Sequence, residues 1–152
     1  TKNGICLGKD YPYTSGKAGL NGECQSTCKK QKLAIDKYSW AVGEDKLEKA
    51  LNTQPVIASV EAGNYAWMFY KSGVVMACPG NDYDHSALVV GYGSEIGVNF
   101  FKLRNSWGLN WGDKGYIKLL RGVGDIGTCR VAEYPLYPKI VGTPAPTTKP
   151  AC

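Results

Sequence analysis

The residue best suited to acid–base chemistry near neutral pH is His85, the only histidine of the chain. It stands in "NDYDHSALVVGYG" (residues 81–93), at the head of an apolar run that is typical of a buried strand. A solitary histidine in such a place is ordinarily a hydrogen-bonded core residue. A partner that held one ring nitrogen would leave the other nitrogen for catalysis, so its function depends on which side chain faces it.

Strand pairing selects Asn105 as that partner. The runs "HSALVVGYG" and "VNFFKLRNSWG" are separated by "SEIG" and have the pattern of an antiparallel hairpin. A turn centred near Glu95 would put His85 directly opposite Asn105, on the same face. Asp84 precedes His85 and should point to the other face. If the Asn105 amide fixes the His85 imidazole, these residues are the second and third members of a nucleophile–His–Asn site. A neutral amide in this position suits a nucleophile that forms a thiolate–imidazolium pair with the histidine.

The elements that must position these residues are mostly strands. Turn formers dominate residues 1–30, and "GEDKLEKALNTQP" has the acidic first turn, apolar face and closing proline of a short helix. "NYAWMFYKSG" is expected to hold one helical turn. Strands are expected at 33–42, 56–62, 74–77, 85–93, 98–108 and 114–122. This order predicts an antiparallel β-rich, barrel-like core with one or two short helices.

Composition indicates one globular domain. The chain has 152 residues, of which 43% are hydrophobic and 20% charged, with a formal net charge of +5. No apolar run approaches the roughly 20 residues of a membrane-spanning helix. The basic residues are dispersed, which argues against a nucleic-acid partner. The N-terminus is too polar for a signal peptide, so we expect that a leader has been removed or that the chain begins inside a longer protein.

Residues 140–152 differ in composition from the rest. "VGTPAPTTKPAC" is rich in Thr and Pro, and it predicts an extended linker or tail, the alternative being an ordinary frayed terminus. Its last residue, Cys152, would be the first cysteine of a following module or an unpaired thiol.

The six cysteines favour disulfides over a metal site. Cys24 and Cys28 form a C-x3-C pair, but no second pair or histidine cluster follows at zinc-ligand spacing. The aromatic and glycine content fits an oxidising compartment, where disulfides persist. Sequence alone does not resolve how six cysteines are connected.

Several segments resemble the C-terminal half of papain-like cysteine peptidases. "YDHSALVVGYG" is followed by "FFKLRNSWGLNWGDKGYIKLLRG", whose "NSWG.NWG..GY" run is among the more specific signatures of that family. "GICLGKDYPYTSG" and "TQPVIASVEA" are similar to other segments of the same half, so the resemblance covers most of residues 1–138. It implies an α+β papain-like fold, of which residues 1–139 would be the β-rich right-hand lobe.

The resemblance also implies roles for single residues. His85 would be the catalytic base, Asn105 its orienter, and Trp107 the indole that shields their hydrogen bond from water. Trp111 would lie on the leaving-group side of the cleft. The positions that match the main specificity pocket of the family are Ser59, Tyr83, Ser86 and Tyr134, which would make that pocket smaller or more polar than usual; for Ser59 and Tyr134, ordinary strand-surface positions are the alternative.

One part of the family pattern is missing, namely the nucleophile. No cysteine of this chain has the "CGSCW"-like context, and the family histidine lies about 130–150 residues beyond the nucleophile. The nucleophile therefore belongs about 45–65 residues before Thr1, in an N-terminal lobe that this chain lacks.

The same resemblance suggests disulfide partners. Cys78 and Cys129 match the disulfide within this lobe, and either Cys24 or Cys28 matches a position whose partner lies in the absent lobe. The remaining one of these two would pair with Cys6.

These inferences predict one part of a cysteine endopeptidase that needs no metal or cofactor. Its expected partners are peptide or protein substrates, protein inhibitors and its own missing lobe, in a secreted or lysosome-like compartment, with neither nucleic acid nor membrane. Two alternatives remain: a non-catalytic homologue whose nucleophile is replaced, and an extracellular binding module on a disulfide-stapled β scaffold.

Overall fold

The described part of the chain forms two compact units. The computed structural model describes residues 4–24, 26–80, 82–124 and 126–141. One unit is Tyr38–Tyr137, and the other consists of the described residues before Tyr38 and after Tyr137. Of the predicted Thr/Pro-rich segment 140–152, the residues from Gly142 to Cys152 lie outside the described residues.

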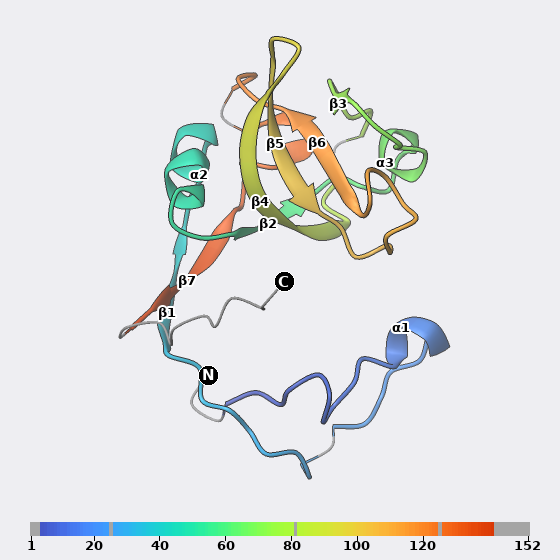
Figure 1. The fold of residues 1–152 in the computed structure, drawn as a ribbon, viewed down its shortest axis with the longest axis vertical. Coiled ribbons are helices and arrows are strands. Elements are labelled where there is room, and N and C mark those ends of the chain that lie inside the picture. Colours follow the sequence, from blue (N-terminus) through green and yellow to red (C-terminus); the bar gives the residue numbers. More distant parts are fainter. Residues whose placement is uncertain (1–3, 25, 81, 125, 142–152) are drawn as a thin grey trace, which may run out of the picture. The chain divides into compact units, whose positions relative to one another are not determined.

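Strands outnumber helices, which confirms the predicted α+β, mostly-sheet class. Among the described residues no helix is both long enough and apolar enough to cross a bilayer. In chain order (Figure 1) the elements are α1 (Ser15–Ala18), β1 (Ile35–Trp40), α2 (Glu44–Leu51), β2 (Val56–Val60), α3 (Tyr65–Met68), β3 (Val74–Val75), β4 (His85–Glu95), β5 (Val98–Arg104), β6 (Tyr116–Leu120), the 3₁₀ helix η1 (Thr128–Arg130) and β7 (Leu136–Ile140).

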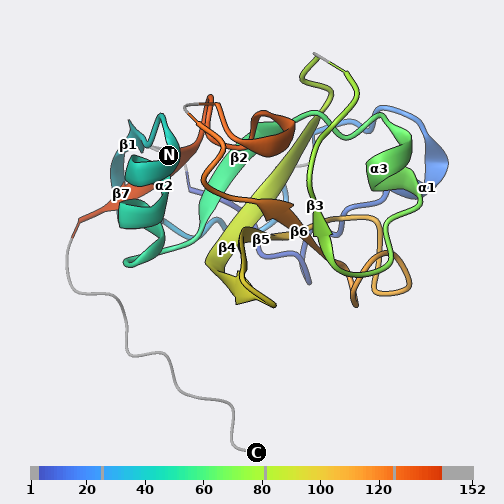
Figure 2. The same ribbon diagram turned by 90° about the horizontal axis from the view of Figure 1, so that it is seen from above.

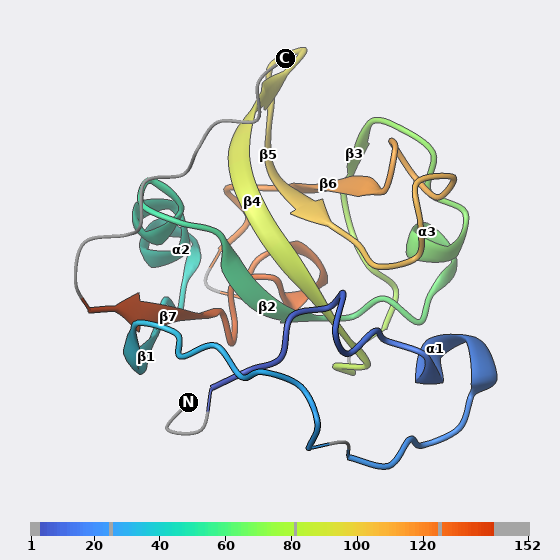
Figure 3. The same ribbon diagram turned by 60° about the horizontal axis from the view of Figure 1, so that its bottom comes forward.

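The seven strands form one open sheet in the order β1-β7-β2-β4-β5-β6-β3. The pairs β2–β4, β2–β7, β4–β5 and β5–β6 are antiparallel, whereas β3 runs parallel to β6. The neighbours β2, β4, β5 and β6 lie side by side in Figures 2 and 3, which also show the long β4 curving across the sheet. Helices α2 and α3 lie on opposite sides of this group of strands (Figure 1).

One face of these strands builds the core, because successive side chains of a strand point to opposite faces. In β2 the buried residues alternate with half-buried or exposed ones, and β5 and β6 contribute two buried apolar side chains each. The core members on these strands are Val56, Ala58, Val60, Ala87, Val89, Phe101, Leu103, Ile117 and Leu119. Burying each large aliphatic side chain stabilises the fold by about 1.5–3 kcal/mol, so this face fixes which residues point away from it.

Three elements were not expected from the sequence, namely α1, η1 and β7. The predicted loop 1–30 contains α1, a single turn that ends at Gly19 with φ +62°. Strand β7 was missed because it is short and contains Pro138, which cannot donate to a strand ladder. The pairing of β7 with β2 is confined to Leu136, opposite Ile57.

The predicted β4–β5 register is wrong. Leu88 opposes Arg104, two residues beyond the Lys102 that the expected register placed there. The turn lies at Ile96–Gly97 rather than near Glu95, and an irregularity between Val89 and Gly91 shifts the ladder once more. The β4–β5 ladder ends at Arg104, so the backbones of His85 and Asn105 are not directly opposed.

The hairpin turn itself is strained. Ile96 has φ +51° and Gly97 has φ +76°, so both central residues are left-handed, as in a type I′ turn. A β-branched residue rarely adopts this backbone, and the Ile96 side chain is 99% exposed, so it gains no packing in return.

Replacing Ile96 by Asn or Gly should therefore stabilise the chain, by about 0.5–1.5 kcal/mol, because both residues adopt positive φ at lower cost. Urea unfolding of I96N, I96G and I96A measures this. Alanine has no β-branch but shares the cost of positive φ, so it should recover less than glycine. Equal gains in all three variants would show that the exposed side chain, not the backbone, was responsible.

Candidate active site

His85 lies where two neighbouring strands meet the loops beside them. It is the first residue of β4 and opposes Val60, the last residue of β2. The backbone N–H of Asp84 donates to the carbonyl of Val60 at 3.3 Å, which extends this pairing by one step. The imidazole is half-buried. Its backbone is thus fixed by the sheet, while its ring projects toward the end of β5.

The imidazole is held by Asn105, the residue after β5. The distance from His85 Nε2 to Asn105 Oδ1 is 2.8 Å. The same oxygen accepts from the backbone N–H of Ser106 at 2.7 Å, which fixes the orientation of the amide because only an oxygen can accept there. Nε2 must therefore carry the proton of this bond. His85 Nδ1 has no hydrogen-bond partner among the described residues.

Asn105 is anchored on its other side as well. It is 8% exposed, and its own backbone N–H donates to the carbonyl of Gly115 at 2.9 Å. In the observed register His85 and Asn105 are diagonal neighbours, and their side chains are long enough to meet. The expected contact between them therefore exists, although the register that suggested it was wrong.

Asp84 does not orient the imidazole. Its two carboxylate oxygens accept from the backbone N–H groups of Ala62 and Gly63, each at 2.8 Å. This agrees with the expectation that the neighbour of His85 in sequence points elsewhere.

Three tryptophans pack around the His85–Asn105 pair. The ring centroid of Trp107 is 5.3 Å from that of His85, and this indole is 41% exposed. Trp67 in α3 is fully buried and packs edge-on against His85 at 6.1 Å. Trp111 stacks on Trp67 at 5.9 Å and donates its Nε1–H to the Trp67 carbonyl at 3.0 Å. Trp107 thus packs against the imidazole, and Trp111 packs against both Trp67 and Trp107.

Trp67 is a site residue that the sequence reading missed. Its segment, "NYAW", was expected to hold only a helical turn. The signal that could have revealed it is local: Asn64 accepts from the Trp67 backbone N–H at 3.2 Å, as the N-cap of α3.

A hollow of about 470 Å³ opens beside the pair. Its lining residues are Ile57, Ser86, Ala87, Leu88, Arg104, Asn105 and Ser106. Of the four residues predicted for a substrate pocket, Ser86 lines this hollow, and Ser59 lies directly opposite Ser86 across the β2–β4 ladder. Residues opposed in this way share a face, so both serines lie on the face turned away from the core.

The other two predicted pocket residues form a separate pair. The rings of Tyr83 and Tyr134 are in edge contact at 5.3 Å, and Arg130 Nη2 donates to the Tyr83 hydroxyl at 3.1 Å. Desolvation and the nearby Glu133 raise the pKa of the Tyr83 phenol, and Arg130 opposes this shift. No hydrogen bond joins the tyrosine pair to the serine pair within the described ranges.

The cysteines are resolved further than the sequence allowed. Disulfides join Cys6 to Cys28 and Cys78 to Cys129, and Cys24 is a free, exposed thiol. Cys24 is therefore the one of the C-x3-C pair left over. Among the described residues no three His, Cys, Asp or Glu side chains come together in a way that could hold a metal ion.

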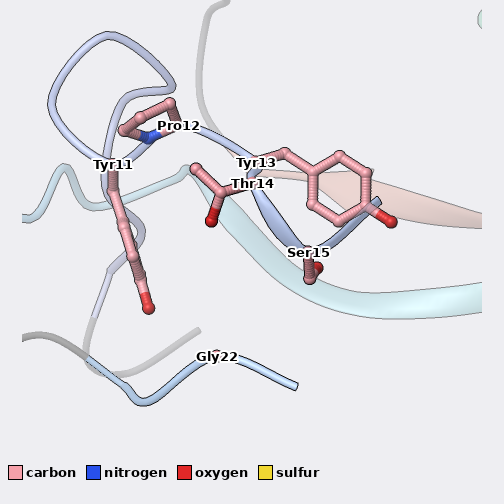
Figure 4. Close-up of a pocket in the computed structure, with 6 residues that line it drawn as sticks. All are labelled: Tyr11, Pro12, Tyr13, Thr14, Ser15 and Gly22. Atoms are coloured by element: carbon pink, nitrogen blue, oxygen red, sulfur yellow. The ribbon is translucent and has the colours of Figure 1, made fainter. Parts of the chain in front are cut away.

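A second hollow, in the unit before Tyr38, offers different chemistry. It measures about 330 Å³ and is lined by Tyr11, Pro12, Tyr13, Thr14, Ser15 and Gly22. Figure 4 shows Tyr11 and Tyr13 projecting from the loop in different directions. Its lining contains no imidazole, carboxylate or thiol, so this hollow offers no acid–base chemistry like that of His85.

Comparison with known proteins gives one consistent family. The family model described as "Papain family cysteine protease" matches residues 1–139. A probable cysteine protease of Arabidopsis thaliana (RDL2) is 42% identical over 139 residues, which are 89% of this chain and 38% of that protein. The cysteine proteinase COT44 of Brassica napus is 40% identical over 89% of this chain and 41% of its own length. The chain thus spans about two fifths of these relatives.

Solved structures agree with this family. The cysteine protease Amb a 11 of ragweed pollen, in its proform, superposes with a TM-score of 0.83 at 34% identity, covering 97% of this chain and 41% of that one. Bromelain of Ananas comosus, in complex with the inhibitor E64, gives a TM-score of 0.81 at 30% identity, and the match covers 91% of this chain and 64% of the bromelain chain.

The geometry predicts a single tautomer for His85. Because Asn105 Oδ1 can only accept, neutral His85 should carry its proton on Nε2. ¹⁵N spectra distinguish protonated from bare ring nitrogens, and the chain has one histidine to observe. We expect the Nε2–H form in the parent chain and a mixture of tautomers in N105A. S106A is the control, because Ser106 contributes its backbone N–H, and its spectrum should match the parent. A parent spectrum dominated by Nδ1–H would contradict the assigned bond.

Proposed function

This chain belongs to the papain family of cysteine proteases, and we propose that it supplies the histidine and asparagine of a Cys–His–Asn peptidase site. The observation that carries the proposal is the 2.8 Å bond from His85 Nε2 to Asn105 Oδ1. It leaves Nδ1 without a hydrogen-bond partner among the described residues. Asn105 and Ser86, the residue after His85, line a hollow. A fixed ring with one available nitrogen is what proton transfer to and from a nucleophile requires.

The proposed reaction follows from this geometry. A cysteine of the preceding lobe transfers its thiol proton to His85 Nδ1, giving a thiolate–imidazolium pair. The thiolate attacks the peptide carbonyl, the C–N bond breaks, and the imidazolium protonates the departing amine. His85 then removes a proton from water, which attacks the thioester and releases the acid and the thiol. Asn105 keeps the ring in place through both steps, and Trp107 limits access of water to their bond.

The nucleophile itself belongs to a segment upstream of Thr1. Four of the six cysteines are in disulfides, and Cys24, in "GECQS", lacks the nucleophile's sequence context. The face of β2 and β4 turned from the core supports a lobe in contact there, since Ile57 is 44% exposed and Leu88 only half-buried. In the intact enzyme this face and the nucleophile's lobe would enclose the cleft.

The remaining roles follow from the same arrangement. We assign Trp111 to the leaving-group side and Ser59, Tyr83, Ser86 and Tyr134 to substrate contacts. Relatives have been solved in a proform and with the inhibitor E64, so a pro-segment and inhibitors are the partners proposed for this cleft besides peptide substrates. The two disulfides support a secreted or lysosome-like compartment.

The central prediction concerns activity. The chain alone should give no thiol-dependent turnover of a fluorogenic peptide, whereas the enzyme that includes the upstream lobe should hydrolyse it. In that enzyme H85A should lower kcat about 10²–10⁴-fold, the usual contribution of a general acid–base residue.

The control is N99A, on the exposed face of β5, which should keep full activity. Turnover by the isolated chain that alkylation abolishes would refute the half-site proposal. A residue other than cysteine at the upstream nucleophile position would favour the non-catalytic homologue instead.

A second prediction concerns Cys24. Because Cys28 pairs with Cys6, Cys24 is the cysteine left for the preceding lobe. Iodoacetamide should alkylate Cys24 in the folded chain alone but not in the intact enzyme, as peptide mapping would show. C24S should also destabilise the intact enzyme by about 2–5 kcal/mol, the usual effect of losing a native disulfide, whereas S26A should not. Equal labelling of Cys24 in both forms would contradict this pairing.

A further inference from the structure

Glu61 is a buried carboxylate without a cationic partner. It is 4% exposed, and among the described residues only Asn105 and Thr128 are comparably buried polar side chains. None of the three ion pairs that the described residues form includes it. A buried charge is costly unless hydrogen bonds replace the lost water, so a carboxylate kept here requires a structural reason.

Two donors converge on one oxygen of this carboxylate. Oε1 of Glu61 accepts from the backbone N–H of Gly80 at 2.6 Å and from Asn64 Nδ2 at 3.0 Å. Gly80 belongs to the loop between β3 and β4, whereas Glu61 directly follows β2. Glu61 therefore ties the end of one core strand to the loop that leads into His85.

Asp84 connects the same two segments, but here the acceptor lies in the loop and the donors follow β2. Its carboxylate accepts from Ala62 and Gly63, the residues after Glu61. The segments approach so closely that a Cβ at either of two glycines would displace a carboxylate oxygen. A Cβ on Gly80 would lie 2.6 Å from Glu61 Oε1, and one on Gly63 would lie 2.3 Å from Asp84 Oδ2. The two carboxylates thus close a tight double connection immediately before His85.

The Glu61 bond also extends to the aromatic side chains behind the imidazole. Asn64, which donates to Glu61, accepts from the Trp67 backbone N–H at 3.2 Å and so caps α3. Trp67 packs against the His85 ring and stacks on Trp111. The Glu61 side chain is therefore hydrogen-bonded to Gly80 in the loop before β4. Through Asn64 it is also connected to Trp67, which packs against the His85 ring.

We propose that Glu61 is a positioning residue for His85: it fixes both the loop that enters β4 and the indole against which the imidazole rests. It makes no hydrogen bond to His85 itself and takes no part in proton transfer. The inference rests on the proposed function only in that His85 is the acid–base residue; the geometric relation between Glu61 and His85 stands independently. A hydrophobic residue could fill the same volume, but it could not accept from Gly80 and Asn64 together.

The imidazole signal of the chain's only histidine tests this without any activity measurement. In E61A, the ¹H–¹³C cross-peak of the His85 ring should shift by several line widths or split, because Trp67 and the preceding loop lose their common anchor. In E61Q the amide oxygen can accept from the same two donors, so the cross-peak should stay close to that of the parent.

A matched control separates positioning from loss of stability. L51A removes a partly buried side chain of α2 and should destabilise the fold by about 2–3 kcal/mol, judged by thermal unfolding, without moving the His85 cross-peak. An E61A cross-peak that moves no further than that of L51A would overturn the proposal. So would an E61Q cross-peak that moves as far as that of E61A.

The intact enzyme gives the functional readout. E61A should lower kcat roughly tenfold or more with KM within about twofold, because a misplaced acid–base residue slows chemistry more than binding. E61Q should recover most of this loss, and equal kcat in E61A and the parent would overturn the functional part. If the parent enzyme itself hydrolyses no peptide, the proposed function fails, while the spectra still decide the relation between Glu61 and His85.

Discussion

The hydrogen bond between His85 Nε2 and Asn105 Oδ1 is the constraint on which the rest of this lobe depends. Its two residues lie 20 positions apart, one at the start of β4 and the other just beyond β5. Neither end is held by the β4–β5 ladder, which stops at Arg104. Outside that ladder, β2 holds His85 through Val60, and the carbonyl of Gly115 holds the backbone of Asn105.

Because the β4–β5 ladder does not reach His85 and Asn105, polar side chains near them bond to backbone N–H groups of the neighbouring loops. The Asn105 amide oxygen serves both an imidazole and the Ser106 N–H, and the Asp84 carboxylate serves two consecutive N–H groups. Each acceptor satisfies loop amides that no strand partner reaches, and an unsatisfied buried amide costs about 1–3 kcal/mol. These hydrogen bonds hold the backbone on both sides of His85 and Asn105, and a proton-transfer group requires such support.

The sequence predicted the fold class and most strands because alternation of buried and exposed residues is a local signal, as in Val56, Ala58 and Val60. It predicted the His85–Asn105 contact through a register that was wrong. The turn at Ile96–Gly97 has an isoleucine where Asn or Gly is usual, so its position carried no turn signal. Diagonal neighbours on one face are still within reach of a histidine and an asparagine, so the shift did not separate them.

What the sequence missed depends on contacts between distant segments. Strand β7 was hidden by Pro138, and its place in the sheet follows from pairing with β2, not from its own composition. Glu61 lies near the end of a predicted strand and Trp67 follows the N-cap Asn64, but their contacts arise only when the loop before His85 returns to the end of β2. The resemblance did not decide whether Cys24 or Cys28 pairs with Cys6, and the structure shows that Cys28 does.

In the proposed enzyme, one lobe orients the histidine and the other lobe supplies the nucleophile. All the groups that orient His85 within the described residues, from Asn105 to Trp67, belong to the unit Tyr38–Tyr137. The imidazole is thus preorganised before any nucleophile approaches it. The one distance left to be set is that between His85 Nδ1 and the sulfur of the other lobe. That distance depends on how two separately folded lobes pack, so changes at the uncovered face of β2 and β4 would act on the thiolate–imidazolium pair without altering the orientation of His85.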